Sequence, residues 1–124
     1  MTVIQAISQV DGLKFNQYTH AEKVRWLNTV EHSIKRTVID THEGGENVEF
    51  TGYQDGLDDH KVLLVPAPYD VLYIHWLEAM IDYNNGENVG YNTSILLYND
   101  AFENYRAWYG RHHMPKRAGT RFLF

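Results

Sequence analysis

Residues 91–109 read YNTSILLYNDAFENYRAWY, and this stretch decides which kind of fold the chain can form. Its large apolar residues recur at alternating intervals of four and three, which is the spacing of one helix face. They are Tyr91, Ile95, Tyr98, Phe102, Tyr105 and Tyr109. A line with this spacing faces a partner helix along its whole length. We therefore predict a packing seam on a long helix from about Glu87 to Arg111, facing other helices of the chain or a second subunit.

A base-stacking platform for a nucleic acid and a pocket for a small aromatic ligand are the two alternative roles for these rings. Rings that stack on single strands usually lie beside positive charge. Residues 87–103, however, contain acidic residues and no Lys or Arg. Packing between protein elements is therefore the favoured interpretation of the seam.

The preceding segment, about residues 69–83, is predicted to be a helix that is apolar nearly all round, with Pro68 near its start. Such a helix is buried on several sides, so we expect it at the centre of the core, with Trp76 in the same packing seam. Its narrow polar stripe consists of His75, Glu78 and Asp82.

Two further helices are predicted before it. Residues 2–13 have helical spacing with Thr2 as N-cap, and Thr19-His20-Ala21-Glu22 matches a capping box that opens a helix ending before Gly44-Gly45. Between that glycine pair and Pro66, two short apolar runs flank a polar stretch, which predicts a β-hairpin at about 48–65. The expected fold is thus mainly α: a four-helix domain with a β-hairpin inserted between helices 2 and 3.

Length and composition support a single domain over residues 1–124, with a body of 1–114 and a tail of 115–124. The chain has no Cys, no apolar run long enough to span a membrane, and no signal-peptide pattern at its start. We therefore expect a protein made in the cytoplasm, without a membrane partner.

The charge is distributed unevenly along the chain. Residues 1–105 contain 6 Lys+Arg and 16 Asp+Glu (−10), and residues 106–124 contain 5 Lys+Arg and no acid (+5). Because an acidic body repels phosphates, a general DNA-binding role is not expected. The basic end is suited to DNA, to an acidic partner, or to the acidic body of another copy.

The polar stripe of the third helix is the main candidate for chemistry. His75, Glu78 and Asp82 share a helix face, and such a pattern can bind a transition metal when a second helix adds ligands. The favoured alternative is a solvent-facing stripe. His112-His113 and Thr41–Gly45 are interpreted as a helix end and a turn. We therefore expect no enzyme activity, no catalytic residue, no cofactor and no metal.

Three stretches together resemble small proteins from the head-morphogenesis region of tailed bacteriophages and prophages. They are IDTHEGGENVEFTGY (39–53), VPAPYDVLYIHWLEAMIDYNNGE (65–87) and YNTSILLYNDAFENYRAWYGRHHMP (91–115). In size and helical layout the chain is similar to head-to-tail connector (adaptor) proteins. That resemblance implies a virion location, a ring of identical copies, contacts with portal and tail proteins, and DNA passing through the channel without specific binding.

In such a ring, the tail of one copy is expected to lie on the acidic face of the next. The tail residues concerned are Lys116, Arg117, Arg121, Phe122, Leu123 and Phe124. Three alternatives remain open: another phage morphogenesis role such as tail completion or scaffolding, a small metal-dependent enzyme using the polar stripe, and a nucleic-acid-binding module acting through residues 106–121.

Overall fold

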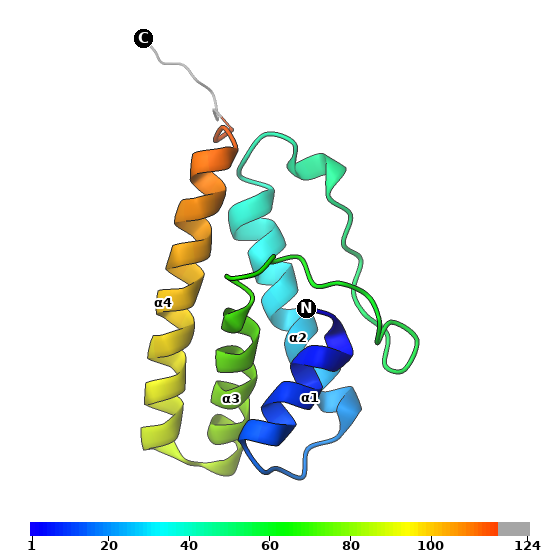
Figure 1. The fold of residues 1–124 in the computed structure, drawn as a ribbon, viewed down its shortest axis with the longest axis vertical. Coiled ribbons are helices and arrows are strands. Elements are labelled where there is room, and N and C mark those ends of the chain that lie inside the picture. Colours follow the sequence, from blue (N-terminus) through cyan, green and yellow to red (C-terminus); the bar gives the residue numbers. More distant parts are fainter. Residues whose placement is uncertain (117–124) are drawn as a thin grey trace.

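The structure is a computed structural model that describes residues 1–116. Its helices, shown in Figure 1, are α1 (Val3–Leu13), α2 (His20–Ile34), α3 (Val71–Asn85) and α4 (Asn88–His112). A π-helical turn, η1 (Lys35–Ile39), extends α2, and a short 3-10 helix, η2 (Gly45–Asn47), follows it. The prediction of four helices is confirmed, and Thr2 and Thr19 both form the side-chain caps expected of them.

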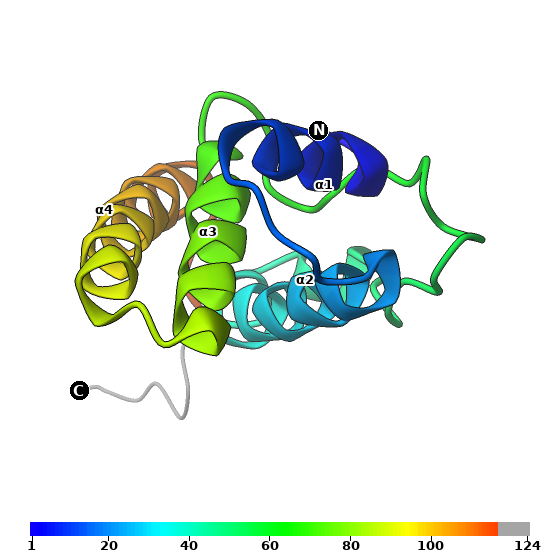
Figure 2. The same cartoon turned by 90° about the horizontal axis from the view of Figure 1, so that it is seen from below.

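Helix α3 lies at the centre of the molecule and packs against α1, α2 and α4 (Figure 2). Its side chains Leu72, Leu77 and Ile81 are fully buried in the core that these helices share. The turn after α3 uses Gly86 at φ 75°, a left-handed conformation that glycine adopts without strain. This turn sends α4 back along α3 and then beyond it, so that the second half of α4 lies beside the end of α2 (Figure 1).

The predicted β-hairpin at 48–65 is wrong. Within residues 1–116 no strand forms, and this segment is an irregular connection that passes along α1 and α2 (Figure 1). Its two apolar runs do not pair with each other. Residues 61–63 instead lie beside the N-terminus, where Thr2 and Val62 form an isolated antiparallel bridge.

The backbone N–H and C=O groups of residues 48–65 find hydrogen-bond partners elsewhere in the chain, which explains why the segment does not need to form a hairpin. Leu63 N–H donates to Met1 O (2.9 Å), and the Asn28 side chain accepts from Tyr53 N–H (2.7 Å) and donates to Tyr53 O (3.0 Å). The N–H groups of Leu64 and Val65 donate to side chains of α2 and α3. Since buried backbone groups need partners but not particular ones, helix side chains replace the missing strand.

Gly45 permits the close approach between η2 and the end of η1. A Cβ atom at this position would lie 2.3 Å from Ile39 O and 2.9 Å from Ile39 C, both backbone atoms. We expect Gly45→Ala to lower the free energy of unfolding by about 1–3 kcal/mol, because the turn must open to admit the methyl group. Urea denaturation measures this, and Gly12→Ala, where nothing lies within 4 Å, is the matched control. Equal midpoints for the two variants would contradict the close approach.

No helix in the described part of the chain has both the length and the apolar character needed to cross a membrane.

Candidate functional site

The aromatic line of α4 faces other elements of the same chain. At its first half, Tyr91 contacts Tyr83 and Tyr98 contacts Trp76 of α3, with ring centroids 5.6 and 5.3 Å apart. Trp76 also donates from Nε1 to Trp26 O of α2 (2.9 Å). The rings therefore lie along the contact between α3 and α4, where Tyr91, Ile95 and Tyr98 are half-buried and Tyr83 is exposed.

The second half of α4 extends past α3 and meets different partners. Tyr69, just before α3, lies 6.4 Å from the Tyr105 ring and 5.4 Å from the Trp108 ring. Tyr109 packs edge-on against His42 in the connection after α2, at 5.2 Å. Tyr105 and Tyr109 are buried, and Phe102 is half-buried beside Tyr98. The seam thus continues along α4 after α3 has ended.

Burial of the seam also sets the chemistry of its phenols. Desolvation, with a smaller contribution from the Glu31 carboxylate, raises the pKa of Tyr98 to about 12. Burial raises the pKa of Tyr105 further. In both residues, burial therefore disfavours the phenolate form.

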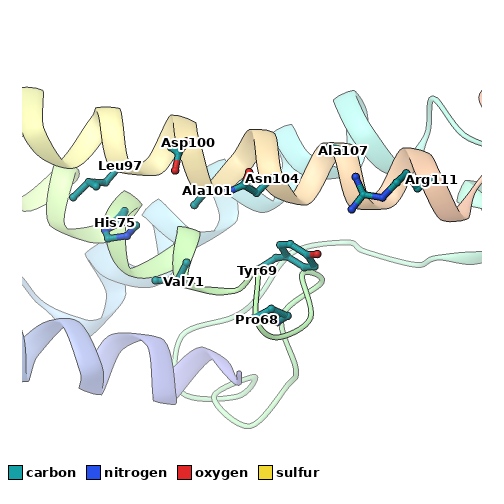
Figure 3. A pocket seen from close by; sticks show the side chains of 10 residues that line it. All are labelled: Pro68, Tyr69, Val71, His75, Leu97, Asp100, Ala101, Asn104, Ala107 and Arg111. Carbon is teal, nitrogen blue, oxygen red and sulfur yellow. The ribbon is translucent and has the colours of Figure 1, made fainter.

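An open groove of about 440 Å³ lies on the other side of α4, beside the start of α3 (Figure 3). Leu97 and His75 lie at one end of it, Arg111 lies at the other end, and Val71, Asp100 and Tyr69 lie between. Asp100 and Arg111 are eleven residues apart on one helix, or about 16 Å along its axis. The charged side chains of Asp100 and Arg111, which both line the groove, are therefore too far apart to contact the same atom of a small ligand.

The sequence favoured a solvent-facing polar stripe on α3. In the structure, however, the three residues of this stripe do not form one exposed surface. His75 and Glu78 are partly exposed, with Nδ1 and Oε1 3.5 Å apart. Asp82, by contrast, is 1% exposed and both its carboxylate oxygens lie 2.8 Å from Lys14 Nζ. Within residues 1–116 the structure brings no three metal-ligating side chains together. Asp82 instead joins α1 to α3 through an ion pair.

The most deeply buried carboxylate among the described residues is Glu31 of α2, a residue that the sequence pattern did not single out. Its side chain is 0% exposed. Oε2 accepts hydrogen bonds from Tyr53 Oη (2.7 Å) and Leu64 N–H (2.9 Å), and Oε1 accepts from Tyr73 Oη. Tyr73 Oη in turn accepts from Val65 N–H (3.0 Å). We call Glu31, Tyr53 and Tyr73 the Glu31 cluster.

The Glu31 cluster holds the irregular connection to the helices. Desolvation raises the pKa of the Glu31 carboxyl, and the hydrogen bonds from Tyr73, Leu64 and Tyr53 oppose that rise. Burial, then the charge of Glu31, raises the pKa of Tyr53 and of Tyr73. Because no cation pairs with Glu31 among the described residues, three neutral donors alone compensate for its lost hydration.

A signal for Glu31 was present in the sequence. It lies seven residues after Val24 and four after Leu27, so it occupies the apolar face of α2. An acidic residue at such a position indicates a buried hydrogen-bonded group. The sequence does not predict that Tyr53 and Tyr73 are its partners, because both lie far from Glu31 along the chain.

Of the predicted tail (115–124), the structure describes Pro115 and Lys116. Lys116 is exposed, its N–H donates to Thr41 O (2.9 Å), and its Nζ lies 3.6 Å from Glu46 Oε2. The remaining tail residues, Arg117, Arg121, Phe122, Leu123 and Phe124, lie outside the described part of the chain.

Comparison of the chain with protein-family models, with curated proteins and with solved structures finds no match.

Proposed function

We propose that this protein is a structural component of a tailed-phage virion, namely a head-to-tail connector that forms a ring between portal and tail. The supporting observation is the outer face of α4. Val89, Leu96 and Leu97 are 82%, 67% and 46% exposed, although the opposite face of the same helix carries the buried seam. A helix with apolar side chains on both sides is suited to contact a second protein surface.

The charge distribution supports the same proposal. The acidic body and the basic segment after residue 105 are complementary, so the tail of one copy can pair with the body of the next. A head-to-tail contact of this kind generates a ring when the rotation closes. An acidic wall around the channel would also let DNA pass without adhering, because like charges repel.

Deletion of the gene from an inducible prophage tests the proposed role. We expect lysates to contain DNA-filled heads and separate tails, because the joint between them is missing. Negative-stain electron microscopy distinguishes the outcomes, and expression of the intact protein from a plasmid should restore joined particles. Empty or misshapen heads would indicate a scaffolding role instead, and normal infectious particles would refute a part in assembly.

The tail contact makes a separate prediction. A variant that ends after Lys116 should fail to restore joined particles, because it lacks the basic and apolar residues of the intersubunit contact. Circular dichroism of the purified variant is the control for folding, since the variant keeps α1 to α4 and the core residues that the structure describes. If the shortened variant restored joined particles as well as the intact protein does, the ring contact would lie elsewhere in the chain. The proposed connector role would not be contradicted by that result.

A further inference from the structure

One histidine holds residues 54–61 against the start of α2. His20 is the first residue of that helix, and each of its ring nitrogens faces a carboxylate. Nδ1 contacts Oδ1 of Asp55, and Nε2 lies 3.3 Å from Oδ1 of Asp59. Nε2 and this Asp59 oxygen are shielded from solvent and have no regular hydrogen bond in the described structure. Since buried polar atoms in native proteins are paired, a proton is expected between them.

Only the protonated ring satisfies both contacts. A neutral imidazole carries one N–H, and its other nitrogen presents a lone pair. Whichever tautomer forms, that lone pair faces a negatively charged oxygen. The imidazolium form donates from both nitrogens and adds the attraction of opposite charges to each hydrogen bond.

The segment that His20 holds also completes the N-terminus of α1. Ile4 N–H donates to Asp59 O (2.9 Å), and Val3 N–H donates to Lys61 O (3.1 Å). These are donors of the first helical turn, which have no acceptor within their own helix. Movement of residues 54–61 away from α2 would therefore also remove two backbone acceptors from α1.

We propose that His20 is a pH-operated latch. Its protonation closes residues 54–61 onto α1 and α2, and loss of the proton loosens this segment together with the first turn of α1. The latch is independent of the proposed ring, since all of its residues belong to one chain.

The other charged groups near the latch have partners of their own. On the segment, Lys61 Nζ lies 3.4 Å from Asp58 Oδ1. On α2, Glu22 accepts the capping hydrogen bonds of Thr19, and Lys23 Nζ lies 2.6 Å from Asp11 of α1.

The N-terminal amino group near α1 lies 3.6 Å from Asp70. His60 on the segment is exposed and provides a control site. The two carboxylates that face the His20 ring are therefore the groups most directly coupled to its proton.

Amide hydrogen exchange followed by NMR tests the latch. We compare protection factors, which correct for intrinsic exchange, at about pH 5.5 and about pH 8, the range over which histidine acts as a proton switch in proteins. The protection factors of the Val3 and Ile4 amides should fall roughly tenfold at the higher pH, the scale of one lost charge-assisted hydrogen bond. The amide of Leu77, in the central helix α3, is the internal reference and should not change.

Three variants assign the effect to His20. In His20→Gln the pH dependence of the Val3 and Ile4 amides should disappear, because the ring that carries the proton is gone. In Asp59→Asn it should weaken but remain, because Asp55 still faces the His20 ring. In His60→Gln it should remain as in the wild type. Equal protection at both pH values in the wild type, or a pH dependence that survives in His20→Gln, would overturn the proposal.

Discussion

Replacement of Glu31 by alanine is expected to lower the free energy of unfolding by about 3–5 kcal/mol. The change leaves the hydroxyls of Tyr53 and Tyr73 and the N–H of Leu64 without their acceptor in a dry interior. It also leaves a cavity at a position that is fully buried in the wild type. Urea denaturation followed by circular dichroism measures the loss.

Glu49→Ala is the matched control for this prediction. Glu49 is an exposed acid in the same irregular connection, so its replacement should change stability by no more than about 0.5 kcal/mol. A Glu31→Ala variant as stable as Glu49→Ala would mean that the cluster does not anchor the connection.

The Glu31 cluster should also make stability depend on pH. Burial raises the folded-state pKa of Glu31 above its ordinary value of 4.5, so the folded protein binds the proton more tightly than the unfolded chain. The contribution of Glu31 is therefore present below that ordinary value and is lost as pH rises through the folded-state pKa. Glu31→Gln keeps the side-chain volume and cannot titrate.

The difference in stability between wild type and Glu31→Gln isolates this contribution, because groups with the opposite sign, such as Asp58, cancel in the subtraction. We expect the difference to shift in favour of Glu31→Gln as pH rises from about 4.5. A difference that is constant with pH would show that Glu31 titrates alike in the folded and unfolded states.

The second large effect is expected from Tyr105→Ala in the aromatic seam. Tyr105 is 1% exposed and contacts Tyr69, Trp108 and Tyr109. Truncation of a large buried aromatic residue removes its burial energy and leaves a cavity that the neighbours only partly fill. We expect a loss of about 3–5 kcal/mol in the free energy of unfolding, measured by chemical denaturation.

Leu96→Ala is the control on the same helix, because Leu96 belongs to the exposed outer face. Its stability should stay within about 0.5 kcal/mol of the wild type. If Tyr105→Ala lowered the free energy of unfolding only slightly, the packing interpretation of the seam would be wrong. A pocket for a small aromatic ligand would then be the better interpretation.

The helices could be predicted from sequence because their determinants are local. A helical N–H bonds to the carbonyl four residues earlier, and caps such as Thr2 and Thr19 bond within three residues. The apolar spacing of α4 likewise depends on neighbours along the chain. The burial of Glu31 was missed although its signal is local. Glu31 has the spacing of a core residue on α2, but a charged residue is not expected in a core.

The irregular connection could not be predicted, because its partners are distant in sequence. Two apolar runs flanking a polar stretch are typical of a hairpin, and nothing within residues 48–65 indicates that Met1, Asn28, Glu31 and Tyr73 will supply the hydrogen bonds instead. The same holds for Asp82, whose burial depends on Lys14 at the end of α1.

By itself, the sequence determined four helices, the caps of the first two, their apolar faces and the central position of the third. Only the tertiary structure decided that 48–65 forms no sheet, that Asp82 and Glu31 are buried, and that His20 lies between two carboxylates. The physical reason is the range of the interactions. Helix hydrogen bonds close within four residues, whereas a buried charge or an unpaired backbone group takes whichever partner the folded chain brings beside it.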